Sequence, residues 1–141
     1  MKRNFFIFLL VIVASSCEKS QEILPPIVGK WEHTYEVQYL NQNGTWSEWI
    51  PINTLLALPS YEFTKKGRFL YDGKIYEACC LPGSFFTLNG DQIAFHFENT
   101  PDCRTVKCAN KNEKTVVSVD ETTLILIEQS GRIKNKYRRT M

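Results

Sequence analysis

The sequence contains no apolar run long enough to cross a membrane. Its longest run, residues 5–13, has about nine residues, whereas a spanning helix needs about twenty. An excess of basic charge is missing as well. Without Lys2 and Arg3, which precede that run, the 17 basic residues become 15 and equal the 15 acidic ones. A nucleic-acid-binding domain normally carries a basic excess, so we expect no nucleic-acid partner.

Short motifs of catalysis are missing too. The chain has no Gly-x-Ser-x-Gly elbow, no His-Glu-x-x-His and no phosphate-binding loop. Its two histidines, His33 and His96, stand in alternating patterns, where packing or surface roles are commoner than catalysis. Zinc could bind cysteines and histidines, but no Cys-x-x-Cys spacing occurs. We therefore expect no enzyme, no metal and no cofactor, although a site built from distant residues stays an alternative.

The amino terminus has the three parts of a secretory signal: Lys2 and Arg3, the apolar run 5–13, and small residues at 14–16. The segment Ala-Ser-Ser-Cys that ends at Cys17 resembles the bacterial lipobox. That resemblance implies cleavage after residue 16 and a lipid on the Cys17 thiol. The alternative is an ordinary secretory signal in which Cys17 stands by chance.

The next residues, 17–27, are predicted to be the lipidated cysteine and a flexible tether, because a polar run leads to a proline pair. Acyl chains would hold the protein on a bilayer without an apolar helix. We therefore expect a location in the bacterial cell envelope, anchored to the outer membrane. Glu18 and Glu22 only partly match a surface-export signal, so the periplasmic and the surface-exposed side both stay open.

The remainder, residues 28–141, forms one domain with a β pattern throughout. Apolar and polar residues alternate in 31–39, which is typical of a half-buried strand. An Asn-Gly pair at 89–90 predicts a tight hairpin turn. Further strands are predicted in 61–63, 68–71, 74–80, 85–88, 92–97, 115–119, 122–127 and 132–139, whereas 51–59 is either a helical turn or an irregular strand. About 8–10 short strands without an amphipathic helix predict a barrel or sandwich.

Four segments carry a resemblance to small lipocalin-like bacterial lipoproteins: Val-Gly-Lys-Trp at 28–31, the hairpin 61–69, and the late segments 123–126 and 136–139. The resemblance implies an all-β fold, an antiparallel up-and-down barrel of about 8–10 strands. It also implies that Trp31 packs at the closed end of the barrel under an arginine, either Arg138 or Arg139.

A lipocalin-like barrel further implies an interior that binds a small apolar ligand, since a barrel of about eight strands can hold one. The lining candidates are Tyr35, Val37, Phe63, Phe69, Phe95 and Leu126. The rival hypothesis is a structural or interaction lipoprotein. Its barrel would be filled by its own side chains, and its surface would contact an envelope protein or a glycan.

Four cysteines remain besides Cys17, and in an exported chain they suggest two disulfides. In an up-and-down meander, Cys79 and Cys80 reach the same rim as Cys103 and Cys108. We therefore predict two bonds between these segments and leave the pairing open. If residues 46–58 add one strand, this rim lies opposite Trp31.

Overall fold

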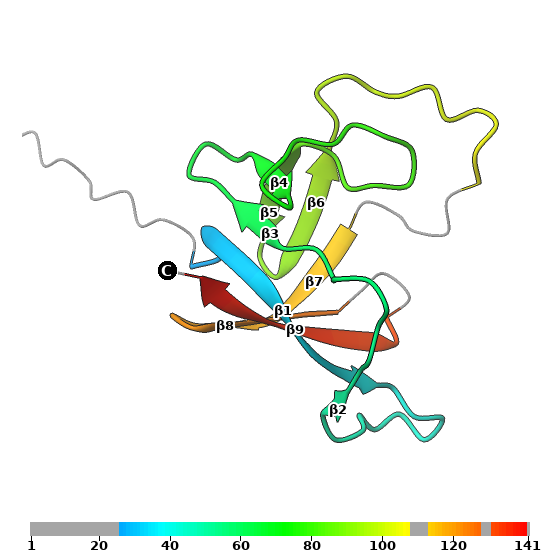
Figure 1. The fold of residues 1–141 in the computed structure, drawn as a ribbon, viewed down its shortest axis with the longest axis vertical. Helices are drawn as coiled ribbons and strands as arrows, with labels where there is room; N and C mark the ends of the chain where they lie inside the picture. The colour runs from blue at the N-terminus through cyan, green and yellow to red at the C-terminus, as the bar shows by residue number, and fades with distance from the viewer. Residues whose placement is uncertain (1–25, 108–112, 128–130, 141) are drawn as a thin grey trace, which may run out of the picture.

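The computed structural model describes residues 26–107, 113–127 and 131–140, and these form nine β strands (Figure 1). Within these ranges, no helix is long and apolar enough to cross a membrane. The strands are β1 (Gly29–Tyr39), β2 (Ile50–Pro51), β3 (Tyr61–Phe63), β4 (Phe69–Tyr71), β5 (Phe85–Asn89), β6 (Gln92–His96), β7 (Glu113–Val119), β8 (Thr123–Ile127) and β9 (Ile133–Thr140).

All neighbouring strands are antiparallel, in the order β4-β3-β1-β9-β8-β7-β6-β5. The two ends of this sheet meet, because Phe69 N donates to Ser84 O (2.8 Å) and Phe86 N to Gly67 O (2.9 Å). Consecutive strands are neighbours except for β2 and β3, because β1 pairs with β2, β3 and β9. The predicted all-β fold, an antiparallel up-and-down barrel, is therefore confirmed.

A bulge divides β1 into two halves. The ladder with β9 shifts register between His33 and Val37, and Tyr35 within the bulge has a φ of 61°. A bulge bends its strand and increases the local twist. The second half of β1 consequently leaves the barrel and pairs with β2, which lies off the main path of the sheet (Figure 1).

Inward-facing side chains fill the barrel. Alternation along each strand directs every second residue inward, and most of these positions hold aromatic or aliphatic residues. The buried cluster consists of Ile27, Trp31, Tyr61, Phe63, Phe69, Phe86, Ile93, Phe95, Leu124, Leu126 and Tyr137. Because eight strands enclose an interior just wide enough for side chains, this cluster forms a continuous core.

The strand expected in residues 74–80 is wrong. Tyr71 N and Lys74 N each donate to the other residue's carbonyl oxygen, at 2.9 and 3.1 Å, around Asp72 and Gly73. Both central residues have positive φ, 51° and 70°, as in the tight turns of hairpins. The chain then continues as a loop to Ser84, where it returns next to Phe69. The hairpin expected from the sequence is thus reduced to one turn.

The two ends of the barrel differ. The turn between β5 and β6 and the turn between β7 and β8 lie at the end that contains Trp31, which we call the closed end. Residues 72–84 and residues 97–107 lie at the opposite end, the open rim (Figure 1). Cys79, Cys80 and Cys103 are therefore at the rim opposite Trp31, as expected, whereas Cys108 lies outside the described residues.

Candidate functional site

The closed end is sealed by Trp31 and an arginine from β9. Trp31 is fully buried, and the Arg139 guanidinium carbon lies 4.3 Å from its ring centroid. The guanidinium also donates hydrogen bonds to the carbonyl oxygens of Val28 (2.8 Å) and Pro26 (2.6 Å). Of the two candidate arginines, Arg139 takes this place, because it is the ladder partner of Trp31, while Arg138 is exposed. Buried and hydrogen-bonded side chains therefore close the interior at this end.

Four of the six expected lining residues belong to the packed core. The ring centroids of Phe63 and Phe69 lie 5.2 Å apart, and those of Phe69 and Phe95 lie 4.7 Å apart. Leu126 is fully buried beside them. These are the separations of aromatic rings in direct contact. The four side chains thus pack against one another instead of lining an open space.

The other two expected lining residues, Tyr35 and Val37, lie at and beyond the bulge. Val37 is buried, with 3% of its surface exposed. Tyr35 is 37% exposed, and its hydroxyl accepts a hydrogen bond from Leu58 N (3.2 Å). The bulge therefore directs Tyr35 toward the loop after β2.

A group of polar side chains lies on the open-rim side of the core. Its members are His33, Tyr61, Tyr71, Lys114 and Asn135, and we call this group the polar belt. Tyr61 begins β3, Tyr71 ends β4 and Lys114 is the second residue of β7, so all three lie where their strands meet the open rim. Tyr61 belongs to the belt and also to the buried cluster, so the polar belt adjoins the aromatic core directly.

Lys114 crosses the barrel. The strand order places β3 and β7 on opposite walls, yet the Lys114 ammonium donates to the Tyr61 hydroxyl (2.9 Å) and lies 4.5 Å from the Tyr61 ring centroid. An ammonium over an aromatic face is attracted by the ring quadrupole. The lysine side chain therefore lies across the barrel above the core.

Asn135 has a buried amide that is only half satisfied. His33 Nδ1 accepts a hydrogen bond from Tyr35 N (2.8 Å), so its Nε2 carries the proton and donates to Asn135 Oδ1 (3.1 Å). The side-chain Nδ2 of Asn135 has no hydrogen-bond partner in the described structure, although only 7% of the residue is exposed. A buried donor without an acceptor is costly.

Tyr71 extends the belt toward the loop. Burial raises the pKa of the Tyr71 hydroxyl, and the nearby Tyr61, Asp72 and Tyr76 add to this shift. The hydroxyl therefore stays protonated as a possible donor. The Tyr76 ring lies edge-on to Tyr71, with centroids 5.9 Å apart.

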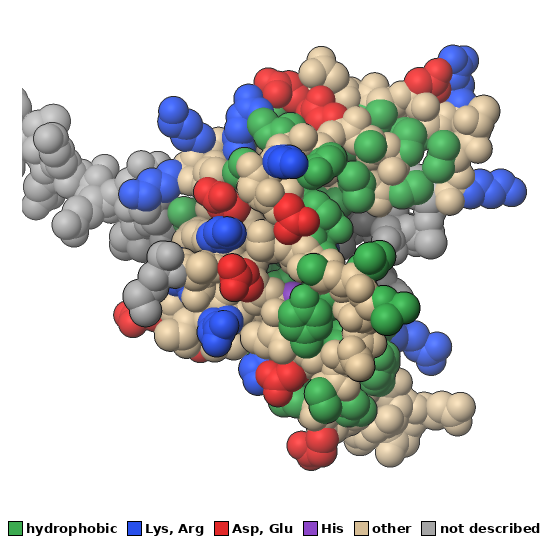
Figure 2. Space-filling view, in the orientation of Figure 1, with side chains coloured by type: hydrophobic (Ala, Val, Ile, Leu, Met, Phe, Trp, Pro, Cys, Tyr) green, Lys and Arg blue, Asp and Glu red, His purple; other side chains and the backbone are tan. Residues whose placement is uncertain are grey.

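Apolar side chains stand exposed beyond the belt. Ile75 and Tyr76, both in the loop after β4, are 45% and 40% exposed. Figure 2 shows hydrophobic side chains gathered on the side of the molecule where the rim loops of Figure 1 lie. The open rim thus combines an exposed apolar edge with a polar belt in which Tyr61 and Asn135 are buried and the other members are half-buried.

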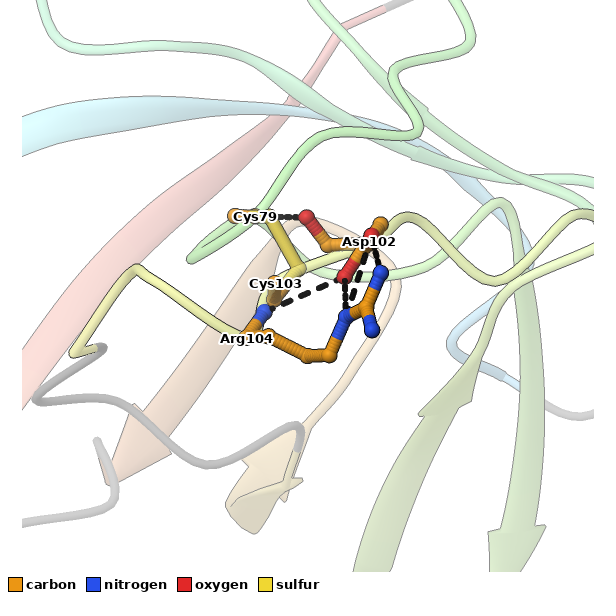
Figure 3. Close-up of a disulfide and its surroundings, with 4 residues drawn as sticks. All are labelled: Cys79, Asp102, Cys103 and Arg104. Atoms are coloured by element: carbon orange, nitrogen blue, oxygen red, sulfur yellow. Dashed lines mark hydrogen bonds and ion pairs between the residues drawn. A yellow bond between two sulfur atoms is a disulfide. The ribbon is translucent and has the colours of Figure 1, made fainter.

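A disulfide between Cys79 and Cys103 joins the two rim loops (Figure 3). Cys80 is disulfide-bonded as well, whereas the predicted partner Cys108 and the predicted lipidation site Cys17 lie outside the described residues. The pairing that the sequence left open is therefore decided for Cys79. A salt bridge between Asp102 and Arg104 flanks it (2.7 Å), but both side chains are largely exposed, and such pairs contribute little stability.

Glu77 holds the same loops together by hydrogen bonds. Its carboxylate accepts from Ser84 Oγ (2.6 Å), Glu98 N (2.7 Å) and Asn99 N (3.2 Å). These bonds, first of all the one from Ser84, lower the pKa of Glu77. The open-rim loops are therefore held together by the disulfide between Cys79 and Cys103 and by hydrogen bonds to the Glu77 carboxylate, which can titrate.

The histidines show no arrangement for metal binding. Among the residues that the structure describes, no three His, Cys, Asp or Glu side chains could hold an ion together. His96 Nε2 contacts Thr87 Oγ1 (3.0 Å) on the exposed face of β5 and β6. His33 is engaged with Asn135.

Sequence reasoning did not identify Asn135 or Lys114. A signal for Asn135 exists, because it shares the inward register of β9 with Ile133 and Tyr137, where an apolar residue is expected. Lys114 shares a face of β7 with Val116 in the same way. Polar residues in the apolar phase of a strand were therefore the available clue.

No family model matches the chain, and no curated protein matches it either. Among solved structures, the chain is similar to a lipocalin-like protein from Bacteroides uniformis ATCC 8492. The two are 21% identical, and the similarity covers 82% of this chain and 100% of the other, with a TM-score of 0.45.

Proposed function

We propose that this chain is a membrane-anchored lipoprotein that binds one small, largely apolar molecule at the open rim of its barrel. The observation that supports this proposal is the difference between the two barrel ends. Trp31 and Arg139 seal one end, whereas the other exposes Ile75 and Tyr76 next to the polar belt. Ligand sites combine apolar side chains with a small number of precisely placed polar groups, and the open rim offers both.

The anchor rests on the amino-terminal sequence. A positive start, a short apolar run and small residues before Cys17 favour export followed by lipidation. Labelled palmitate should enter the wild-type protein in a bacterial host, and the protein should sediment with membranes. Cys17→Ser should abolish both. Equal labelling of the two proteins would contradict this part of the proposal.

Ligand binding can be measured on residues 18–141, which contain all nine strands. The probe is N-phenyl-1-naphthylamine, a neutral fluorophore that brightens in apolar surroundings. We expect saturable binding by the wild type and weaker binding by Ile75→Ser. Val117→Ser is the matched control, because Val117 is similarly exposed (43% against 45%) but lies on β7. Binding that Ile75→Ser leaves unchanged would place the probe elsewhere.

Native mass spectrometry of the same protein, purified from a bacterial periplasm, tests for a ligand acquired in the cell. An additional mass that is released on denaturation would support the proposal and identify the molecule. A bare mass together with no probe binding would contradict it.

The packed core favours a second candidate, a module that acts through its surface. Leu55 and Leu56 are 105% and 80% exposed, and side chains of this kind often mark contact sites. An envelope protein or a glycan would then be the partner. Absence of probe binding would favour this candidate over the first.

A further inference from the structure

Asn135 requires an acceptor that the described part of the chain does not supply. Its Oδ1 is occupied by the His33 Nε2 proton, and that proton is fixed because His33 Nδ1 already accepts from Tyr35 N. Rotating the amide by 180° would place two donors face to face. The orientation is therefore fixed, and Nδ2 remains a buried donor without a partner among residues 26–107, 113–127 and 131–140.

A second donor lies close to Asn135 on the inner wall. Asn135 and Val116 are both ladder partners of Leu126, so only β8 separates them. Lys114 lies two residues from Val116 on the same face of β7. Three rings also connect these donors. The Tyr61 centroid is 4.5 Å from the Lys114 ammonium and 5.1 Å from the Tyr137 centroid, and the His33 ring contacts both Tyr137 (5.0 Å between centroids) and Asn135 (3.1 Å). An amide donor and a cation therefore face the same part of the barrel.

We propose that the ligand of the open rim is an amphipathic carboxylate whose head group binds Lys114 and Asn135. This inference rests on the proposed function. The carboxylate would accept from Asn135 Nδ2 and from the Lys114 ammonium, in place of the hydrogen bond that the ammonium donates to the Tyr61 hydroxyl. The apolar part of the ligand would lie toward Ile75 and Tyr76, which are exposed at the rim. A carboxylate suits this pair because it accepts several hydrogen bonds and carries the opposite charge.

Displacement of N-phenyl-1-naphthylamine from residues 18–141 tests the carboxylate inference separately from the proposal that the open rim binds a ligand. The competitors are decanoic acid, methyl decanoate and decan-1-ol, which share one apolar chain and differ at the head. We expect decanoic acid to bind at least about tenfold more tightly than the ester or the alcohol, as one charge-assisted hydrogen bond would give. Equal affinities would overturn the carboxylate inference and leave the proposed function standing. Absence of probe binding would overturn both.

Variants of Lys114 and Asn135 test which of these residues bind the head group of the ligand. Lys114→Met should remove the preference for the acid without weakening the ester, and Lys114→Arg should keep it. Lys134→Met is the control, because this lysine lies on the outer wall over Trp46 (4.1 Å). A preference that survives Lys114→Met would overturn the inference.

Asn135→Asp gives a readout that a purely structural role would not produce. The substitution keeps the size and the acceptor for His33 but replaces the free donor by an acceptor. We expect it to lower the affinity for decanoic acid at least about tenfold and to leave methyl decanoate less affected. An equal loss of affinity for decanoic acid and methyl decanoate would show that Asn135 does not bind the head group.

Discussion

Replacing Phe63 by alanine tests whether the barrel interior is a packed core or a ligand cavity. The Phe63 side chain is fully buried. Its ring contacts Phe86 and Phe69 with centroid distances of 5.0 and 5.2 Å, and Phe95 lies at 6.4 Å. If the interior is packed, the substitution leaves a void that these three rings line.

The expected loss follows from these contacts. A buried Phe→Ala change costs about 3–5 kcal/mol, and each aromatic pair adds about 0.5–1.5 kcal/mol beyond burial. With two rings in close contact, we expect Phe63→Ala to lower the free energy of unfolding by about 4 kcal/mol. For a domain of this size, the melting temperature should fall by about 15–20 °C. Phe85→Ala is the control, because Phe85 is half-buried beneath Arg68 and should cost about 1 kcal/mol.

Urea unfolding followed by tryptophan fluorescence provides the measurement, with the disulfides left intact. Should Phe63→Ala fail to fold, Phe63→Leu offers a milder truncation that should cost about 1.5 kcal/mol. A loss below about 1.5 kcal/mol for Phe63→Ala would refute the reasoning. In that case the phenyl ring would face a space that water or a ligand can fill, and the interior would be a cavity.

Three further predictions concern the open rim. Gly83→Ala should strongly destabilise the protein in urea unfolding, because an added Cβ would lie 2.0 Å from His96 O; a change below about 0.5 kcal/mol would contradict this. Replacing Cys79 and Cys103 by serine together should cost about 3 kcal/mol in the same assay, since a disulfide with a sequence separation of 24 is lost; unchanged stability would show that this bond does not stabilise the fold. The lowered pKa of Glu77 means that its stabilisation is complete above the unfolded pKa of about 4.3 and is lost as pH falls through the lower folded pKa. Between pH 5 and pH 3, urea midpoints should therefore fall more for the wild type than for Glu77→Gln, and parallel curves would contradict this.

Local sequence was sufficient for the strands whose pattern repeats every second residue. The alternation in β1 and the turn at Asn89 and Gly90, where Gly90 has a φ of 62°, were both predicted from neighbouring residues. Local signals failed at 74–80, because hydrogen bonding from Phe69 to Ser84 excludes that segment from the sheet. Strand pairing depends on residues that are distant in the sequence, and no local pattern encodes it.

The candidate site was predictable only in part, for the same reason. That Trp31 closes one end under an arginine was implied by its motif, but the choice of Arg139 depended on the register of β9 against β1. The lining residues were chosen for their apolar character, and four of them pack together because the barrel is only eight strands wide. The polar belt was missed, since its members come from five different strands.

The sequence by itself determined the strand alternation, the tight turns, the balanced charge and the motif before Cys17, because these depend on residues within a few positions of one another. Only the tertiary structure decided that Cys79 pairs with Cys103. It also decided that Lys114 reaches Tyr61 across the barrel and that Asn135 is buried with a donor that no described residue satisfies. These features arise when the sheet closes on itself, since closure brings opposite walls within hydrogen-bonding distance.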